Sequence, residues 1–306
     1  MVQSMMGLLA VGLILDALLG EPKWLWSRLS HPVVLIGRTI RFWDNSFNSP
    51  PAQKLKGAVC LCFLVVTATL AGFGLSQLGP IVETVAIAIF IAQKSLADHV
   101  SAVASGLRLS LSDGKSAVSQ IVGRDTADMD EAQVARAAIE SAAENFSDGV
   151  IAPIFWYMVA GLPGLILYKT VNTADSMIGY KTDTYRAFGW ASARFDDLLN
   201  FIPARLSAVL LCWAAGNFWL RGWSGITKDA KMHRSPNAGW PEAAMARALD
   251  IALSGPRSYD GALQEYAWVN KGGNKHANAH DIDRATRMLW SAWALCLLLI
   301  LVFSLI

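Results

Sequence analysis

Long apolar runs alternate with polar segments along the chain, and three of the runs are long enough to cross a bilayer. A membrane-spanning helix needs about 20 mostly apolar residues. Lys56–Ser76 meets this requirement, and Pro80–Ala97 follows it after a tight Gly-Pro turn, so the two runs predict a helical hairpin. Met288–Ile306 is a third span, whereas Met1–Gly20 is shorter and contains Asp16. The pattern is typical of a polytopic membrane protein.

Two further apolar stretches are interrupted, and the sequence leaves their path open. Val150–Tyr168 contains a Gly-Leu-Pro-Gly break, and Phe201–Leu220 carries Pro203 and Arg205 near its start. Charged or broken segments at membrane depth usually line a protein-covered or wet cavity. The segments 21–56, with six basic and two acidic residues, and 221–287, with ten and seven, are predicted to be cytoplasmic. The hairpin crosses twice and returns the chain to the cytoplasmic side. Because 221–287 is also predicted to lie on that side, the two interrupted stretches must either both cross the membrane or both turn back.

Composition supports the membrane class and excludes several others. Of the 306 residues, 54% are hydrophobic and 16% are charged, against about 25% charged residues in soluble domains. The net charge of +2 argues against nucleic-acid binding, four cysteines argue against a disulfide scaffold, and twelve tryptophans argue against disorder. The first residues lack the basic start of a secretory signal. We predict an all-α polytopic integral membrane protein with four to six membrane segments, forming one domain over 1–306 with cytoplasmic helical segments at 98–149 and 221–287.

The densest polar cluster comes just before the first interrupted stretch. Asp130–Phe146 has helical periodicity, and Glu140, Glu144 and Asp148 follow one another at four-residue spacing, which places them on one helix face. A solvated acidic face is the ordinary explanation of such a run. Here the run leads into an apolar segment, where carboxylates need a cation or a proton to neutralise them. Oxygen-only ligands favour Mg²⁺, which commonly takes one or two carboxylates together with substrate phosphates.

Two more clusters follow in the second half of the chain. Lys169, Asn172 and Asp175 lie three apart, so a cation, an amide and a carboxylate share a helix face that could hold a phosphate and its metal. An amphipathic interface helix is the alternative. Arg186, Arg194 and Arg205 are candidate anion clamps, because a guanidinium matches phosphate and carboxylate geometry.

Two adjacent acids, Asp196 and Asp197, and a loop later in the chain are the remaining candidates for the functional site. Asp196 and Asp197 are further metal or base candidates, although an ordinary ion pair between Arg194 and Asp197 explains the spacing equally well. The segment that contains Asn237 and Pro241 predicts a rigid loop before a helix N-terminus, which offers N–H groups to an anion. The chain has no G-x-x-x-x-G-K-[ST] sequence, so any ATP site is not a P-loop.

Several long motifs occur together and in a fixed order. They are D-x3-GEP, HPV-x3-G, ESAAENFSDGVIAPIFW, YKTVNTADSMIGY, YRAFGWASARFDDLLNFIPAR and SPNAGWPEAAMA. With them the chain resembles the adenosylcobinamide-phosphate synthase (CobD/CbiB) family from about Asp16 to Gly261. The resemblance implies a bacterial inner-membrane ligase that uses ATP and Mg²⁺ and whose active site faces the cytoplasm. It joins adenosylcobyric acid to (R)-1-aminopropan-2-ol or its O-phosphate in cobalamin biosynthesis.

The resemblance also suggests roles for the candidate residues. Expected catalytic groups are Glu140, Glu144, Asp148, Lys169 and Asp175, of which Glu144, Asp148 and Asp175 are the expected metal ligands. Expected substrate or phosphate ligands are Asn145, Asn172, Arg186, Arg194, Asp197, Arg205 and Asn237. Aromatic walls for the corrinoid, or simple interface packing, are expected of Trp156, Phe188, Trp190 and Trp240. We expect these stretches to converge on one metal-and-phosphate cavity at the inner face of the membrane.

The expected partners follow from the same resemblance. They are the corrinoid, the amino alcohol or its phosphate, ATP and membrane lipid, and either other cobalamin-assembly enzymes or further copies of the chain. Two alternatives remain at this point. A transporter would use the interrupted stretches as a mid-membrane site, and a non-catalytic membrane regulator could share the fold.

Overall fold

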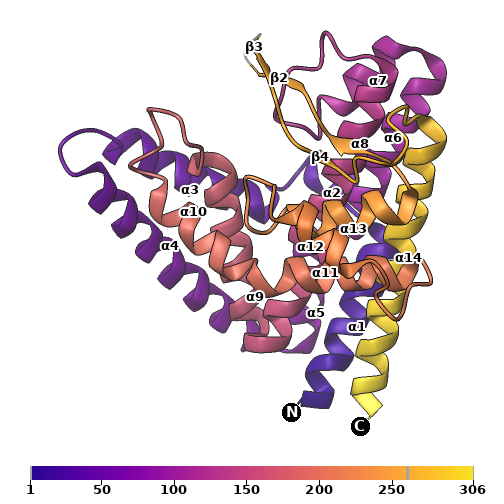
Figure 1. Cartoon of the computed structure of the whole chain (residues 1–306). Coiled ribbons are helices and arrows are strands. Elements are labelled where there is room, and N and C mark those ends of the chain that lie inside the picture. The colour runs from indigo at the N-terminus through magenta and orange to yellow at the C-terminus, as the bar shows by residue number, and fades with distance from the viewer. Residues whose placement is uncertain (1, 260–261, 306) are drawn as a thin grey trace. The chain divides into compact units, whose positions relative to one another are not determined.

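The computed structural model describes residues 2–259 and 262–305, and it is mostly helical (Figure 1). The chain forms two compact units, and each unit combines segments that lie far apart in the sequence. Unit 1 comprises Met1–Ala92, Ala152–Phe201 and Ile300–Ile306, and unit 2 comprises Gln93–Ile151 and Ile202–Leu299. Each unit buries apolar side chains of its own. The organisation as a single domain stays a prediction.

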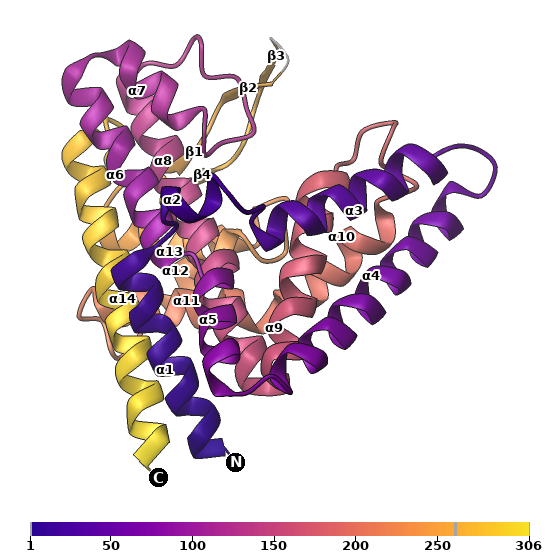
Figure 2. The ribbon, with the colours of Figure 1, turned by 180° about the vertical axis from the view of Figure 1, so that it is seen from behind.

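The described part of unit 1 contains helices of very different length, besides the last turns of the C-terminal helix. They are α1 (Val2–Leu19), α2 (Lys23–Trp26), α3 (Pro32–Phe47), α4 (Gln53–Ser76), α5 (Pro80–Phe90), α9 (Ala152–Ile178) and α10 (Trp190–Leu199). The longest interface of the unit is formed by α4 and α9, and α10 packs against both of these helices (Figure 2). In addition, α3 packs on α9 and α1 packs on α5.

The core of unit 1 lies between α3, α4 and α9. Its fully buried side chains are Ile40, Cys60, Leu64, Ala174, Ile178 and Phe188. A Cβ at Gly57 would lie 1.8 Å from the carbonyl oxygen of Phe188, so glycine lets the α4 backbone contact the turn that precedes α10. Cys62, two residues after Cys60, is exposed, as expected for neighbouring positions on different faces of a helix.

The helix α9 is broken where the sequence predicts an interruption. Gly161 has φ of +63° and ψ of −156°, and the preceding Ala160 is also outside the helical region. Backbone of this kind is accessible almost only to glycine. Pro163 follows, and proline has no N–H to continue the helical hydrogen bonds. The Gly-Leu-Pro-Gly sequence therefore explains the break.

Unit 2 contains the remaining elements. Its helices are α6 (Gln93–Leu109), α7 (Leu111–Val118), α8 (Glu131–Phe146), the π-helix η1 (Ser147–Ile151), α11 (Phe201–Ala214, from its second residue), α12 (Trp223–Ala230), α13 (Gly239–Leu249) and α14 (Ala279–Leu305, up to Leu299). The helix α8 packs against α6, α7 and α13, and α13 in turn packs against α12 (Figure 1).

In the part of unit 2 that the structure describes, four short strands form two small antiparallel ladders. They are β1 (Leu253–Ser254), β2 (Arg257–Tyr259), β3 (Ala262–Gln264) and β4 (Trp268–Val269), with β1 paired to β4 and β2 paired to β3. They lie in the segment 221–287, for which the sequence predicted helices. Ladders of two or three residues are too short to leave a period-two pattern, which needs about four to eight residues. The all-α class is unaffected.

Within residues 2–259 and 262–305, four helical stretches are long and apolar enough to cross a membrane. They are Gln53–Ser76, Pro80–Leu109, Glu131–Ile178 and Ala279–Leu305, and a fifth would form if the pair Trp190–Leu199 and Phe201–Ala214, bent by 45°, is one span. The helix Gln3–Leu19 is apolar but shorter. The predicted hairpin and the C-terminal span are therefore confirmed, and the chain is a multi-pass membrane protein. Whether the interrupted stretches cross or return stays a prediction.

Candidate functional site

The helix α8 begins at Glu131, one residue after the predicted start, and Asp130 is its cap. The Asp130 carboxylate accepts the N–H of Gln133 at 2.7 Å, and the Gln133 side chain accepts the N–H of Asp130 at 2.8 Å. This reciprocal arrangement is a capping box, which satisfies two N–H groups at the start of the helix. It fixes the first turn of the helix that carries Glu140 and Glu144.

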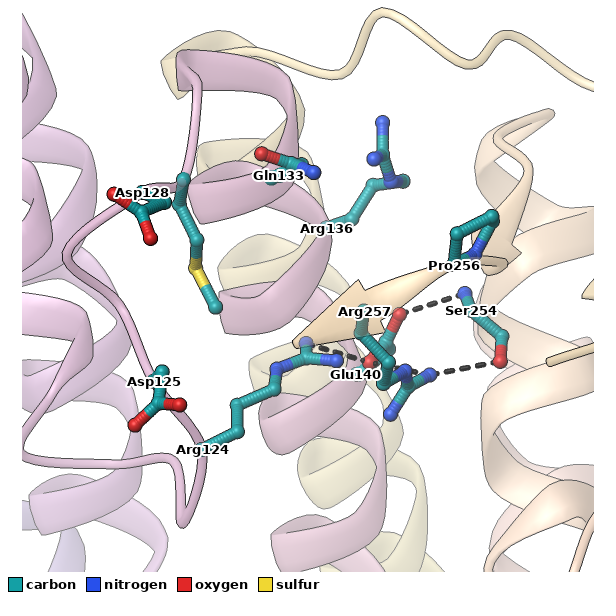
Figure 3. A pocket seen from close by; sticks show the side chains of 10 residues that line it. Arg124, Asp125, Asp128, Gln133, Arg136, Glu140, Ser254, Pro256 and Arg257 are labelled. Atoms are coloured by element: carbon teal, nitrogen blue, oxygen red, sulfur yellow. Dashed lines mark hydrogen bonds and ion pairs between the residues drawn. The ribbon is translucent and has the colours of Figure 1, made fainter. Parts of the chain in front are cut away.

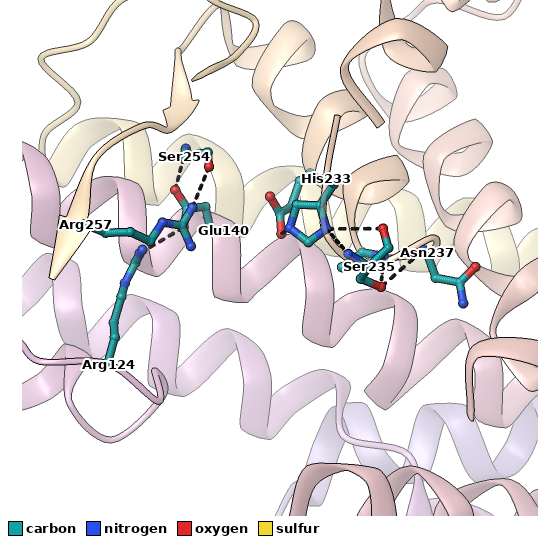
Figure 4. A network of polar contacts seen from close by, with 9 residues as sticks. Arg124, Glu140, His233, Ser235, Asn237, Ser254 and Arg257 are labelled. Carbon is teal, nitrogen blue, oxygen red and sulfur yellow. Dashed lines mark hydrogen bonds and ion pairs between the residues drawn. The ribbon is translucent and has the colours of Figure 1, made fainter. Parts of the chain in front are cut away.

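Glu140 lies at the centre of a buried ion-pair network (Figure 4). Its Oε2 is 2.9 Å from Nη2 of Arg124 and 3.1 Å from Nη2 of Arg257, and its Oε1 accepts the N–H of Ser254 at 2.6 Å. A buried carboxylate requires such partners, because its charge is costly away from water. Both carboxylate oxygens of Glu140 are thus engaged by the protein itself.

The other two acids of this run lie in different surroundings. Glu144 is exposed and Asp148 is partly exposed, whereas Glu140 is buried. The α-helical spacing applies only as far as Phe146, because the π-helix η1 follows and contains Asp148. π-Helical turns are frequent at functional sites. Asn145, the amide between the acids, donates to the carbonyl oxygen and the hydroxyl of Ser141 at 2.9 and 3.1 Å.

A further acid, Glu242 on α13, was not among the predicted site residues. Its side chain is buried, and its Oε2 has no hydrogen-bond partner among the described residues. Burial raises the pKa of Glu242 well above its usual value, and the negative charges of Glu140 and Glu144 raise this pKa further. Glu242 lies within the motif SPNAGWPEAAMA, from which the sequence analysis inferred a helix start but no role for this carboxyl group.

His233 faces Glu242 and belongs to the loop that precedes α13. Its Nε2 lies 3.5 Å from Oε1 of Glu242, and its Nδ1 accepts the N–H of Ser235 at 3.0 Å. The hydroxyl of Ser235 accepts the N–H groups of Asn237 and Ala238, both at 3.2 Å (Figure 4). Burial lowers the pKa of His233, and the charge of Arg257 contributes to this lowering. The predicted rigid loop is therefore present, and its own serine satisfies two of its N–H groups.

Two predicted ligands, Arg205 and Asn237, are brought together in unit 2. Nη1 of Arg205 donates to Oδ1 of Asn237 at 3.3 Å, and the guanidinium lies 4.6 Å from the ring centroid of Trp240. The two residues are 32 positions apart in sequence. A cation over an aromatic face is stabilised electrostatically without losing its charge. Arg205 is thus held in one orientation while it stays positive.

A cavity of about 260 Å³ lies beside Glu140 (Figure 3). It is lined by Arg124, Asp125, Asp128, Met129, Gln133, Arg136, Glu140, Ser254, Pro256 and Arg257. The three arginines were not predicted as site residues. Arg124 is 16 residues before Glu140, and Ser254, which donates its backbone N–H to the same carboxylate, is 114 residues after it. No spacing in the sequence indicates such a contact.

Unit 1 holds a second polar cluster, between α9 and α10. Asn172 donates to Oδ1 of Asp196 at 3.4 Å, Asn200 donates to Oδ2 of Asp196 at 2.9 Å, and the Tyr168 hydroxyl donates to Oδ1 of Asn200 at 2.9 Å. Asp196 and Asn200 are buried. Asp175 lies close enough to Asp196 for their charges to interact. The second and third sequence clusters therefore do meet, through Asn172, Asp175 and Asp196.

Other predicted residues of unit 1 lie around this cluster. Arg194 and Asp197 form the ordinary ion pair that the sequence allowed, with Nη1 and Oδ2 3.8 Å apart. Lys169 is half-buried on α9, and Arg186 is exposed in the turn before α10. A Cβ at Gly179 would lie 2.0 Å from Oδ1 of Asp175, so the glycine makes room for this carboxylate.

The aromatic residues that were considered as corrinoid walls differ in exposure. Phe188 is fully buried in the core of unit 1. Trp156 donates its indole N–H to the carbonyl oxygen of Leu199 at 3.1 Å. Trp190 is exposed, with Nζ of Lys54 3.8 Å from its ring centroid.

The expected metal ligands are divided between the units. Glu144 and Asp148 belong to unit 2 and Asp175 belongs to unit 1. Over residues 2–259 and 262–305, no group of three or more His, Cys, Asp or Glu side chains is arranged to hold a metal ion. Mg²⁺ commonly binds to one or two carboxylates and completes its shell with water and phosphates. The metal assignment, and the convergence of the three stretches on one cavity, stay predictions.

Comparison with known proteins gives a consistent set of relatives. A protein of Rhizobium meliloti (strain 1021) named "Cobalamin biosynthesis protein CobD" is 49% identical over 93% of this chain and 92% of its own length. Proteins with the same name from Sinorhizobium fredii and Brucella suis biovar 1 are 50% and 46% identical, over 93% and 97% of this chain and 92% and 96% of their own lengths. No solved structure matches the chain. The family model described as "CobD/Cbib protein" matches residues 9–289. The chain therefore belongs to the CobD/CbiB protein family.

Proposed function

We propose that this chain is an amide-forming ligase of cobalamin biosynthesis. It joins a carboxylate of adenosylcobyric acid to (R)-1-aminopropan-2-ol or to the O-phosphate of this amino alcohol, and it uses ATP and Mg²⁺. Its family, and the names of relatives that are up to 50% identical over almost their whole length, support the role in cobalamin biosynthesis. The chemistry of its buried polar groups supports the ligation.

The reaction sets clear requirements for the side chains. A carboxylate is a poor acylating agent, because an oxide ion would have to leave, and phosphorylation by ATP replaces this leaving group by phosphate. The amine nitrogen then bonds to the carbonyl carbon, the C–O bond breaks with its electrons going to phosphate, and the nitrogen loses protons. Basic side chains must hold the phosphates, and a carboxylate must accept a proton from the amine.

Glu242 is the observation that carries the proposal. It is a buried carboxyl group with one oxygen, Oε2, that has no hydrogen-bond partner among the described residues, and it lies near the exposed Glu144. A carboxyl group whose pKa is raised takes a proton more readily than an ordinary one, which suits the deprotonation of an amine. Glu144 would attract the ammonium form of the amine, and the ionised form of Glu242 would accept its proton.

The other predicted residues supply binding groups. Arg205, fixed by Asn237 and Trp240, presents a positive charge for a phosphate or a substrate carboxylate. In unit 1, Asn172 and Asp175 offer an amide and a carboxylate for the corrinoid or for Mg²⁺. Glu144, Asp148 and Asp175 have the oxygen donors that Mg²⁺ prefers, and when bound the ion would neutralise phosphate charge.

We further propose that the site faces the cytoplasm at the bacterial inner membrane. The basic segments 21–56 and 221–287 support this orientation under the positive-inside bias. ATP and both forms of the amine are polar, so a site open to the aqueous cytoplasm would give them direct access. Association with other cobalamin-assembly enzymes or with a second copy of the chain belongs to the same proposal.

The decisive experiment uses the full chain, purified in detergent or reconstituted in nanodiscs. It is incubated with adenosylcobyric acid, each of the two amine forms, ATP and Mg²⁺, and the product is followed by mass spectrometry. We expect a product whose mass equals the sum of corrinoid and amine less one water, and only when ATP and Mg²⁺ are both present. ADP and AMP are measured in the same samples to identify the nucleotide product.

Other outcomes would favour the alternatives. Uptake of corrinoid or amine into proteoliposomes without any new amide would support a transporter. Absence of both product and flux, in a protein that still binds its ligands, would support a regulator. Either result would refute the proposal that the chain is a ligase.

A further inference from the structure

One face of the helix α3 packs inside unit 1. Ile40 is fully buried in the core, and Ile36 and Trp43 pack against the same cluster. Their spacing of three and four residues places these side chains on one side of the helix. In Figure 2 no other element of unit 1 lies over the opposite side of α3. That side therefore faces the surroundings of the unit.

This outer face of α3 exposes large apolar side chains together with two arginines. Val34, Leu35 and Phe42 are 47%, 50% and 63% exposed, and Arg38 and Arg41 are exposed among them. Arg38 is three residues after Leu35 and four before Phe42, so the three side chains follow one another along the helix surface. A face that mixes cations with large apolar groups suits neither bulk water nor lipid tails alone. It is typical of helices that lie in the boundary between the two.

The charge of the outer face is not balanced by an acid. Within the residues that the structure describes, neither Arg38 nor Arg41 forms an ion pair. The single acid of α3, Asp44, is engaged elsewhere. Its Oδ1 accepts the side-chain N–H of Asn48 at 2.9 Å, and its Oδ2 accepts the hydroxyl of Tyr185 at 3.1 Å. An anion at the outer face would therefore meet two cations and no competing carboxylate.

The segment just before α3 has the same character. Trp24, in α2, is a large exposed side chain, and Arg28 and Leu29 behind it are exposed as well. The rings of Trp26 and His31 lie 4.4 Å apart, and His31 caps the start of α3, so this segment is attached to that helix. Tryptophan is enriched at the membrane–water interface. The mixture of cations and apolar groups thus extends beyond a single helix.

We propose that the outer face of α3 lies in the membrane interface and selects anionic phospholipids, whose phosphate groups bind to Arg38 and Arg41. The planar guanidinium group matches the geometry of a phosphate, and a negatively charged lipid surface attracts basic side chains close to it. Val34, Leu35 and Phe42 would contact the upper part of the acyl chains. The lipid environment follows from the membrane-spanning helices of the chain. The inference does not rest on the proposed ligase activity, so either one can fail without the other.

The first test measures which lipid the full chain binds in detergent, by native mass spectrometry. The probes are phosphatidylglycerol, which is anionic, and phosphatidylcholine, which is zwitterionic, with identical acyl chains. Wild type should bind phosphatidylglycerol more tightly. The double variant Arg38→Gln with Arg41→Gln should lose at least about tenfold of this affinity, because each basic residue near an anionic lipid surface contributes about fivefold. Its affinity for phosphatidylcholine should not change.

Two further double variants serve as controls. Lys231→Gln with Lys271→Gln removes the same charge from exposed positions of unit 2 and should bind both lipids like wild type. Arg38→Lys with Arg41→Lys keeps the charge of the outer face and should retain most of the selectivity. Unchanged binding of phosphatidylglycerol in the glutamine variant of α3, or an equal loss in the control from unit 2, would overturn the proposal.

The second test locates the outer face relative to the lipid, and it keeps both arginines. Asn45 is exposed and lies four residues after Arg41, on the same side of α3. Asn45→Cys is introduced together with Cys62→Ala, because the other three cysteines are buried. The new cysteine is labelled with a fluorophore, and the full chain is placed in nanodiscs that contain phosphatidylglycerol. We expect quenching by lipids that carry a spin label on the headgroup.

Absence of this quenching would overturn the proposal. Quenching by dissolved iodide alone would place the outer face in water, and protection from both quenchers would indicate a protein partner. Thermal unfolding of each variant checks its fold. If the glutamine variant of α3 does not fold, the fluorophore at position 45 still decides whether this face contacts lipid headgroups.

Discussion

Nε2 of His233 lies 3.5 Å from Oε1 of Glu242, and both side chains are largely removed from solvent in unit 2. Nδ1 of His233 lies 3.0 Å from the backbone nitrogen and 3.3 Å from the carbonyl oxygen of Ser235, so Ser235 fixes the orientation of the ring. Burial favours the uncharged form of each group, since it lowers the pKa of His233 and raises that of Glu242. The pair therefore combines a histidine that burial keeps neutral with a carboxyl group whose raised pKa makes it a stronger base once it is ionised.

Replacement of Glu242 tests its role in proton transfer. Glu242→Gln keeps the size and the contact with His233 but cannot accept a proton, so we expect kcat for amide formation to fall at least about a hundredfold, which is typical for loss of a general base. Glu242→Asp should retain measurable activity. Initial rates at saturating and at low amine concentration separate kcat from KM. A folded Glu242→Gln protein with wild-type kcat would remove Glu242 from the mechanism.

Replacement of Glu144 tests whether the predicted run of acidic residues takes part in the reaction. Glu144→Gln should abolish amide formation while the protein remains folded, because Glu144 is exposed and its replacement leaves the buried contacts of α8 unchanged. Product mass and thermal unfolding are measured on the same preparation. Glu131→Gln, at an exposed position in the first turn of the same helix, is the control and should be active. Retained activity in Glu144→Gln would exclude it as a ligand or base.

Glu140 should behave differently from Glu144, because its carboxylate stabilises the fold. Glu140→Gln leaves Arg124 and Arg257 buried without their counter-charge, and breaking a buried pair in this way typically costs about 3–5 kcal/mol. We expect a large fall in the unfolding temperature, measured by differential scanning fluorimetry. A Glu140→Gln protein as stable as wild type would show that the two arginines are neutralised by other groups.

The raised pKa of Glu242 predicts a pH dependence of stability. In the unfolded chain its carboxyl group loses its proton near the usual value of about 4.5, whereas the folded protein keeps the proton to higher pH. The unfolding free energy should therefore fall as pH rises from about 5 toward the raised pKa. The neighbours Glu140 and Glu144 favour the protonated form, and Arg124 and Arg257 oppose it. Glu242→Gln should show a shallower fall over this range in denaturant titrations.

The buried hydrogen bonds of Asn200 predict a stability effect in unit 1. Asn200→Ala removes a partner from the Tyr168 hydroxyl and from Oδ2 of Asp196. An unsatisfied buried polar group costs about 1–3 kcal/mol, so the unfolding free energy should fall by at least this amount. Gln120→Ala, at an exposed position, is the control and should have little effect. A negligible change at Asn200 would mean that water replaces its amide.

Much of the architecture could be predicted from the sequence, because it depends on local patterns. Apolar runs of sufficient length gave the hairpin and the C-terminal span, and Gly161 and Pro163 marked the break in α9 through their backbone preferences. The motif that starts α13 was interpreted correctly as a loop and a helix start. These features require only neighbouring residues, so their signal survives in a single sequence.

The buried charge network could not be predicted, because it depends on distant pairs. Arg124 and Arg257 meet Glu140 only after the loop before α8 and the strand β2 have packed against that helix. Neither arginine lies at a sequence spacing from Glu140 that would indicate contact with it. Glu242 was visible in its motif, but only burial next to His233 distinguishes it from an ordinary first-turn acid.

The rings of Tyr266 and Trp268 each lie between two cations. Tyr266 contacts Arg234 and Arg257, and Trp268 contacts Arg136 and Lys275. Arg257 is also held by the carboxylate of Glu140, but its contact with the ring of Tyr266 does not depend on that carboxylate. Cation–π contacts leave the charge of each cation in place, so acid does not abolish the positive field on this face of unit 2, and dissolved salt is what weakens it.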